Sequence, residues 1–222
     1  NSIAIGSQIA VSQEGSIVLG SPSSVGSKSV ALGNETIATG EGSSAVGYKA
    51  QASDGHSTAV GSTTISGIAS TVFGKGAAAA GTYSTAVGAG ANSQNFVQAT
   101  SVGFSAYSLG NDSTAVGYGA GAGEKSTAVG VGAVSIGTDN VVLGNNVTSQ
   151  KSSKLVIVGD TNVRADETFN SSVVIGSSEY PGAARKVKEV VAIGKDVLFL
   201  NDGGIAIGDT AAVGLSPSAN NA

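Results

Sequence analysis

The sequence predicts an all-β fold, a parallel β-roll with about 14 residues in each coil and two short strands per coil. The first observation is a repeat, clearest in residues 113–130, STAVGYGAGAGEKSTAVG, where Gly117 and Gly130 each close the same phrase. The second is the composition, with 34 glycines, 41 % apolar residues, 5 % aromatic residues and neither Trp nor Met. Self-similarity at a nearly constant period indicates stacked repeats, and this composition suits a narrow interior.

The closing glycine marks one copy of the repeat after another along the chain. The spacing between copies is nearly constant at first and lengthens before Gly176 and Gly194. The glycines are Gly6, Gly20, Gly33, Gly47, Gly61, Gly74, Gly88, Gly103, Gly117, Gly130, Gly144, Gly159, Gly176, Gly194 and Gly208.

The residues before each glycine predict the first strand of a coil. An apolar residue such as Val116 directly precedes the glycine in every copy, and a small residue such as Ala115 usually comes before it. Thr114 and its equivalents, two residues before the last apolar position, are mostly β-branched, which suits a strand. Because successive side chains of a strand point to opposite faces, the valine and the alanine must face opposite ways. We expect the apolar position before the glycine to fill the interior of the roll.

A second, weaker strand is expected half a period later, for example at residues 36–40 and 77–81. Two strands and two tight turns account for all residues of a coil. A three-sided helix built from hexapeptides needs about 18 residues in each coil, so a flattened, two-sided roll fits the period better.

The repeats predict one domain over residues 1–214. The coils are regular to about residue 144 and looser afterwards, with loop insertions expected at 160–170 and 177–189, because a solenoid expels extra residues to one face. Residues 215–222 are small and polar and are expected to form a flexible tail or linker.

The net charge of −4 and the absence of cysteine limit the partners and ligands. A chain with this balance provides no cationic field for nucleic acid or an anionic membrane, so neither is expected as a partner. Without cysteine there are no disulfides and no thiolate metal sites. No apolar run reaches about 18 residues, so this segment is not expected to insert into a membrane. The chain begins within a repeat, and we expect targeting and anchoring segments to lie outside it.

Motifs for catalysis, cofactors and metals are not found in the sequence. His56 is the single histidine and is expected to lie in an exposed turn. The glycine-rich stretch 117–126 does not match a phosphate-binding loop, because Glu124 separates the glycine from the lysine. The acidic residues are scattered along the coils and form no calcium-binding motif. We therefore expect no enzymatic activity, no cofactor and no metal site.

The one local basic cluster lies in the second expected insertion. Arg185, Lys186 and Lys188 stand near Tyr180, and these four residues are the candidate contacts for an anionic glycan or a matrix protein. The alternative is a solvated loop whose charges are balanced by neighbouring glutamates.

The repeat resembles the YadA-like head of trimeric autotransporter adhesins of Gram-negative bacteria. The similarity is carried by NSIAIG at residues 1–6, KSVALG at 28–33 and the repeated STAVG units, and it extends more loosely over residues 151–214. It implies a left-handed parallel β-roll, assembled as a homotrimer on a coiled-coil stalk above an outer-membrane anchor. It also implies adhesion to host extracellular matrix or cells, and therefore a place on the bacterial cell surface.

A trimer offers a role for the small residue of the first strand. If the apolar position fills the roll, the small residue can face the threefold axis and allow three rolls to approach closely. The candidate trimer-interface residues on this hypothesis are Ala59, Ala86, Ala115 and Ala128.

The function expected from these observations is an adhesive head that binds a host matrix protein or a cell-surface glycoconjugate through many weak contacts. One alternative is the receptor-binding segment of a phage tail fibre. Another is a structural or ice-binding solenoid, suggested by threonine at alternating positions along one face. Because each threonine shares its face with the apolar position expected to be buried, we expect this row to point inward.

Overall fold

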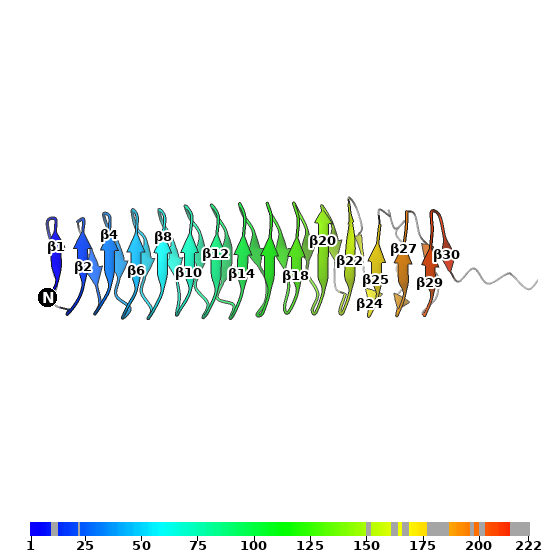
Figure 1. The fold of residues 1–222 in the computed structure, drawn as a ribbon, viewed down its shortest axis with the longest axis horizontal. Coiled ribbons are helices and arrows are strands. Elements are labelled where there is room, and N and C mark those ends of the chain that lie inside the picture. The colour runs from blue at the N-terminus through cyan, green and yellow to red at the C-terminus, as the bar shows by residue number, and fades with distance from the viewer. Residues whose placement is uncertain are drawn as a thin grey trace, which may run out of the picture.

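The computed structural model describes residues 1–9, 13–21, 23–149, 152–160, 164–165, 169–176, 187–195, 198–199 and 203–213. They form a parallel β-solenoid whose turns are about 14 residues apart, and no helix occurs in these ranges. Figure 1 shows a straight rod in which each coil repeats the shape of the one before it. The predicted fold class is confirmed in its parallel architecture and its period.

The first strands of the coils form one sheet of fifteen strands. Every pairing is parallel and in register; for example, Thr114, Ala115 and Val116 pair with the same positions of the next coil. In order the strands are β1 (Ile3–Ile5), β2 (Ile17–Leu19), β4 (Val30–Leu32), β6 (Ser44–Val46), β8 (Thr58–Val60), β10 (Thr71–Phe73), β12 (Thr85–Val87), β14 (Thr100–Val102), β16 (Thr114–Val116), β18 (Thr127–Val129), β20 (Val141–Asn145), β22 (Val156–Asp160), β25 (Val173–Ile175), β27 (Val191–Ile193) and β29 (Ile205–Ile207).

The second strands are shorter and form a parallel sheet of eleven strands, with two further pairs near the C-terminal end. The second strands expected within 36–40 and 77–81 are confirmed as β5 and β11. The eleven strands are β3 (Ser24–Val25), β5 (Ile37–Ala38), β7 (Gln51–Ala52), β9 (Ile65–Ser66), β11 (Ala78–Ala79), β13 (Asn92–Gln94), β15 (Tyr107–Ser108), β17 (Gly121–Ala122), β19 (Val134–Ser135), β21 (Thr148–Ser149) and β23 (Arg164–Ala165). The further pairs are β24 (Phe169–Asn170) with β26 (Val187–Lys188) and β28 (Leu198–Phe199) with β30 (Ala212–Val213).

The interior of the roll is lined by the small residue of each strand, so the expected assignment of the two faces of the first strand was wrong. Ala59, Ala86, Ala115 and Ala128 have no exposed surface in the single chain, whereas Val129 is 37 % exposed. The physical reason is the width of the roll. Two short strands joined by tight turns bring the two sheets close together, so alanine and serine fill most of the positions between them, with valine at a few such as Val18 and Val72. The four alanines proposed for the trimer interface therefore belong to the core of one chain.

Serine hydroxyls complete the interior at the entry to each first strand. The Ser43 hydroxyl donates a hydrogen bond to the carbonyl oxygen of Gly40 at 2.7 Å, and Ser113 does the same to Gly110 at 2.7 Å. Each bond satisfies a buried turn carbonyl within the same coil. The hydroxyl thus fixes the turn that leads into the strand.

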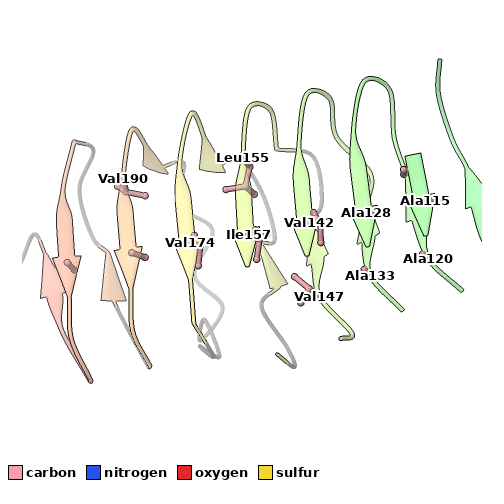
Figure 2. Close-up of a cluster of buried hydrophobic side chains, with 13 residues drawn as sticks. Ala115, Ala120, Ala128, Ala133, Val142, Val147, Leu155, Ile157, Val174 and Val190 are labelled. Carbon is pink, nitrogen blue, oxygen red and sulfur yellow. The ribbon is translucent and has the colours of Figure 1, made fainter. Parts of the chain in front are cut away.

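The core becomes bulkier toward the C-terminal coils. Asn140 takes the serine position; its amide group donates to the carbonyl oxygen of Ser152 at 2.9 Å, and the amide of Leu155 donates to its side-chain oxygen at 2.9 Å. From there Val142, Leu155 and Ile157 replace alanine and serine inside the roll (Figure 2).

The predicted insertions at 160–170 and 177–189 fall largely outside the described residues, as does the predicted tail at 215–222. Within them the structure describes β23, β24 and β26, which continue the parallel stacking.

Candidate functional site

The outward side of the fifteen-stranded sheet is the largest candidate surface of the rod. We call it the apolar face; it consists of the first and third residues of each strand, such as Thr114 and Val116 in β16. These side chains are half-buried or exposed in the single chain, and Phe73 is 43 % exposed. The third residues form an unbroken row of apolar side chains from coil to coil. An apolar row of this length is unusual for a monomer and is typical of an interface.

The threonines of the middle coils lie on the apolar face, contrary to the expectation that they point inward. Thr100, Thr114 and Thr127 are partly accessible and pair side by side in register across β14, β16 and β18. The alternation places them on the same side as the valines and opposite the buried alanines. The size of the residues was the available signal: alanine and serine predominate inside the roll, whereas the first and third positions of these strands carry threonine and valine.

The edges of the rod carry the charged side chains, and two ion pairs connect neighbouring coils in the described part. The ammonium of Lys28 lies 3.0 Å from a carboxylate oxygen of Glu41, and that of Lys49 lies 3.4 Å from Glu35. The hydrogen bond from Lys28, followed by its charge, holds the pKa of Glu41 below the usual value of a glutamate. Both pairs are solvated and orient the turns more than they stabilise them.

The predicted basic cluster is not placed by the structure. Tyr180, Arg185 and Lys186 lie outside the described residues, and Lys188 ends strand β26, whose side chains are also not described. These four residues remain a prediction.

No group of three or more side chains suited to a metal ion occurs among the described residues. His56 lies in a turn at the edge of the rod, with a positive φ of 56°, as expected for an exposed turn residue. Nor do the described ranges contain a helix with the length and apolar character that a membrane span requires.

Comparison with known families gives one match. The family model of the YadA head domain repeat matches residues 38–64, 66–91 and 97–120, in two copies. These residues cover the coils from β5 to the turn after β16. A comparison with curated proteins finds no significant match.

Proposed function

We propose that this chain, whose residues 38–120 are a YadA-like head domain, is the adhesive head of a trimeric autotransporter displayed on a bacterial surface. The observation that supports this most is the match of head repeats on a parallel β-solenoid. That family and this fold serve structural and adhesive roles, and we propose that the chain has no enzymatic activity. The left-handed sense of the coil, and anchoring in the outer membrane through other segments, belong to the same proposal.

A homotrimer is part of the proposal, and its support is the apolar face. Valines such as Val102 and Val116 stand there with partly accessible side chains in strand after strand. Burying them against two further copies of the chain would remove a long apolar surface from water, at about 25 cal/mol for each Å².

The adhesive mechanism we propose is multivalency. Three identical heads in each trimer, and many trimers on each cell, turn weak contacts with a matrix protein or a glycoconjugate into firm attachment. Contacts from the basic cluster of Tyr180, Arg185, Lys186 and Lys188 are a further part of the proposal, because insertions in solenoids commonly form the binding face.

Binding of the chain to immobilised collagen, fibronectin and laminin tests this function, with whole bacterial envelopes as a second target. Saturable binding to a matrix protein is the expected result. An R185A/K186A/K188A variant is expected to bind more weakly, and normal binding would remove the basic cluster from the proposal. Binding to envelopes alone would contradict the adhesin and favour a phage fibre.

One observation favours a second function, ice binding. The outward row of Thr58, Thr71, Thr85, Thr100, Thr114 and Thr127 is regular and flat, with spacings set by the strands. A trimer would cover this row, so the two functions exclude each other on this face. Thermal hysteresis measured on the chain decides between them: we expect none, and a clear effect would favour the ice-binding solenoid.

A further inference from the structure

A turn follows the first strand of each coil, and the first residues of these turns stack into a column along one edge of the rod. Backbone hydrogen bonds fix the order, because the amide of the second residue of each turn donates to the carbonyl of the first residue of the turn in the preceding coil. The amide of Gly90 donates to the carbonyl of Lys75 at 2.9 Å, that of Ser105 to Ala89 at 3.0 Å, that of Gly119 to Phe104 at 2.9 Å and that of Gly132 to Tyr118 at 2.8 Å. The side chains of Lys75, Ala89, Phe104, Tyr118 and Val131 are therefore consecutive rungs of one ladder.

Two aromatic rings occupy neighbouring rungs of this ladder. Phe104 and Tyr118 stack with their ring centroids 5.4 Å apart and an angle of 8° between the ring planes. They remain 55 % and 61 % exposed. Tyr118 covers one face of the Phe104 ring, and the other face is directed along the ladder toward Ala89.

The rung at Ala89 leaves that face open. A methyl group is too small to cover a phenyl ring, and the next turn residue, Gly90, has no side chain. Since neighbouring coils are about 4.8 Å apart, the turns of Phe104 and Lys75 are separated by about 9 to 10 Å, which leaves room for one more ring stacked on Phe104.

Polar groups frame this open rung. A Cβ placed on Gly90 would meet only the hydroxyl oxygen of Ser105, at 3.5 Å, so this hydroxyl lies beside the turn that carries Ala89. Lys75 is the rung on the other side of Ala89 from Phe104, and its side chain is exposed. Neither ion pair of the described residues involves it. Lys75 is also the one charged side chain in the six turns from residues 62–63 to 131–132.

We infer that the open rung at Ala89 is a binding site for a sugar ring that carries a carboxylate. The apolar face of a pyranose would stack on Phe104, as ring faces do with other apolar groups. The Ser105 hydroxyl would hydrogen-bond a sugar hydroxyl, and the Lys75 ammonium would pair with the carboxylate, in a charge-assisted hydrogen bond. An aromatic side chain of a protein partner would fill the same space but would leave the hydroxyl and the ammonium unused. The inference rests on the adhesive function proposed above and deepens it by naming a ligand class.

The test is calorimetric titration of the full chain with two probes, a hyaluronan hexasaccharide that carries glucuronate and the neutral chitohexaose. The wild-type chain is expected to bind the acidic probe at least tenfold more tightly than the neutral one. The decisive variant is Ala89→Phe, which adds the missing ring to the ladder and should lower the affinity for the acidic probe at least tenfold. Ala89→Ser is its matched control and should bind as the wild type does.

Two further variants separate the contacts. Phe104→Ala removes the stacking face and should lower the affinity for both probes, whereas Lys75→Gln should lower it for the acidic probe only. Far-UV circular dichroism of each variant should be unchanged, because all three positions are turn residues at the edge of the rod. An Ala89→Phe chain that binds normally would overturn the site. Equal binding of the two probes by the wild type would overturn the acidic ligand, and absence of binding to the acidic probe would overturn the inference as a whole.

The same proteins in the matrix-binding assay distinguish this inference from the adhesive function. A wild-type chain that adheres to matrix but binds neither sugar leaves the adhesin standing and removes the site. A chain that binds the acidic sugar through Phe104 and Lys75 but does not adhere keeps the site and removes the function.

Discussion

Gly117 lies so close to Gly130 of the next coil that a Cβ built on Gly117 would overlap the carbonyl oxygen of Gly130. The same overlap recurs at the closing glycines of the neighbouring coils. The backbone at Gly117 also has a φ of 134°, which side chains rarely adopt. The glycine that marks the repeat in the sequence is therefore a point of close backbone approach between consecutive coils.

Replacing Gly117 by alanine is expected to cost more than about 3 kcal/mol of unfolding free energy, because the added methyl group collides with the backbone and the dihedral is strained. Gly119, two residues later, is the matched control. Its φ is also positive, at 60°, but a Cβ there meets no atom within 4 Å. Gly119→Ala should cost about 1 kcal/mol. Urea denaturation followed by circular dichroism measures both variants, and equal losses would contradict the close contact between coils.

A buried hydroxyl in β9 gives a prediction in the opposite direction. The side-chain oxygen of Ser66 is buried without a hydrogen-bond partner. Ser66→Ala should therefore leave the free energy of unfolding unchanged or raise it by up to about 1 kcal/mol, and the melting temperature should stay the same or rise accordingly. Ser108 occupies the same position in β15, where its hydroxyl shares a hydrogen bond of 3.0 Å with that of Ser101. Ser108→Ala should lower stability by about 1 kcal/mol. A lower melting temperature for Ser66→Ala would show that its hydroxyl has a partner, such as a buried water.

Strain in a turn leads to a third prediction. Thr63 is β-branched and has a φ of 56°, a left-handed conformation that asparagine tolerates much better. Thr63→Asn should raise the free energy of unfolding by about 0.5 to 1 kcal/mol. Thr58→Asn, in strand β8, serves as the contrasting variant and should lower it, because asparagine is unfavourable in a strand. Chemical denaturation measures both, and a loss of stability in Thr63→Asn would contradict the strained turn.

The architecture could be predicted from the sequence because the same pattern of strand and turn residues recurs in every coil. The period of the glycines indicated the coil length, and the β-branched residues before each glycine indicated the first strand. Hydrophobicity alone could not show which face of each first strand points into the roll, because both Ala115 and Val116 are apolar. The decisive quantity is the distance between the two sheets, which favours alanine at most interior positions and leaves room for valine at a few, such as Val18 and Val72. A single copy of the repeat does not reveal this distance.

The stacking of Phe104 on Tyr118 could also not be predicted from the sequence. Phe104 and Tyr118 belong to successive copies of the repeat, and each occurs in a turn that looks ordinary in isolation. They become a site only when the register of the coils stacks one turn on the next. The basic cluster, in contrast, was prominent in the sequence, and most of it lies outside the described residues.

The ion pair between Lys28 and Glu41 predicts a measurable titration. The pKa of Glu41 is lowered in the folded state. The ion pair therefore stabilises the fold at pH values above the usual glutamate pKa of about 4.3, and this stabilisation is lost as the pH falls through the lowered pKa. Nuclear magnetic resonance titration of Glu41 should show the lowered pKa, and Lys28→Gln should return it to the usual range. A pKa unchanged by this substitution would exclude the pair in solution.

In the proposed trimer the apolar face joins three chains, while the alanines fill each roll. Sedimentation equilibrium can distinguish the two faces when the wild-type chain is compared with a Val102→Glu/Val116→Glu variant and with Ala115→Glu. We expect three times the mass of one chain for the wild type, and a monomer with unchanged circular dichroism for the valine variant. Ala115→Glu should lose its β-structure, because the charge would be buried. A wild-type chain that stays monomeric at every concentration, or a valine variant that still forms trimers, would contradict the claim.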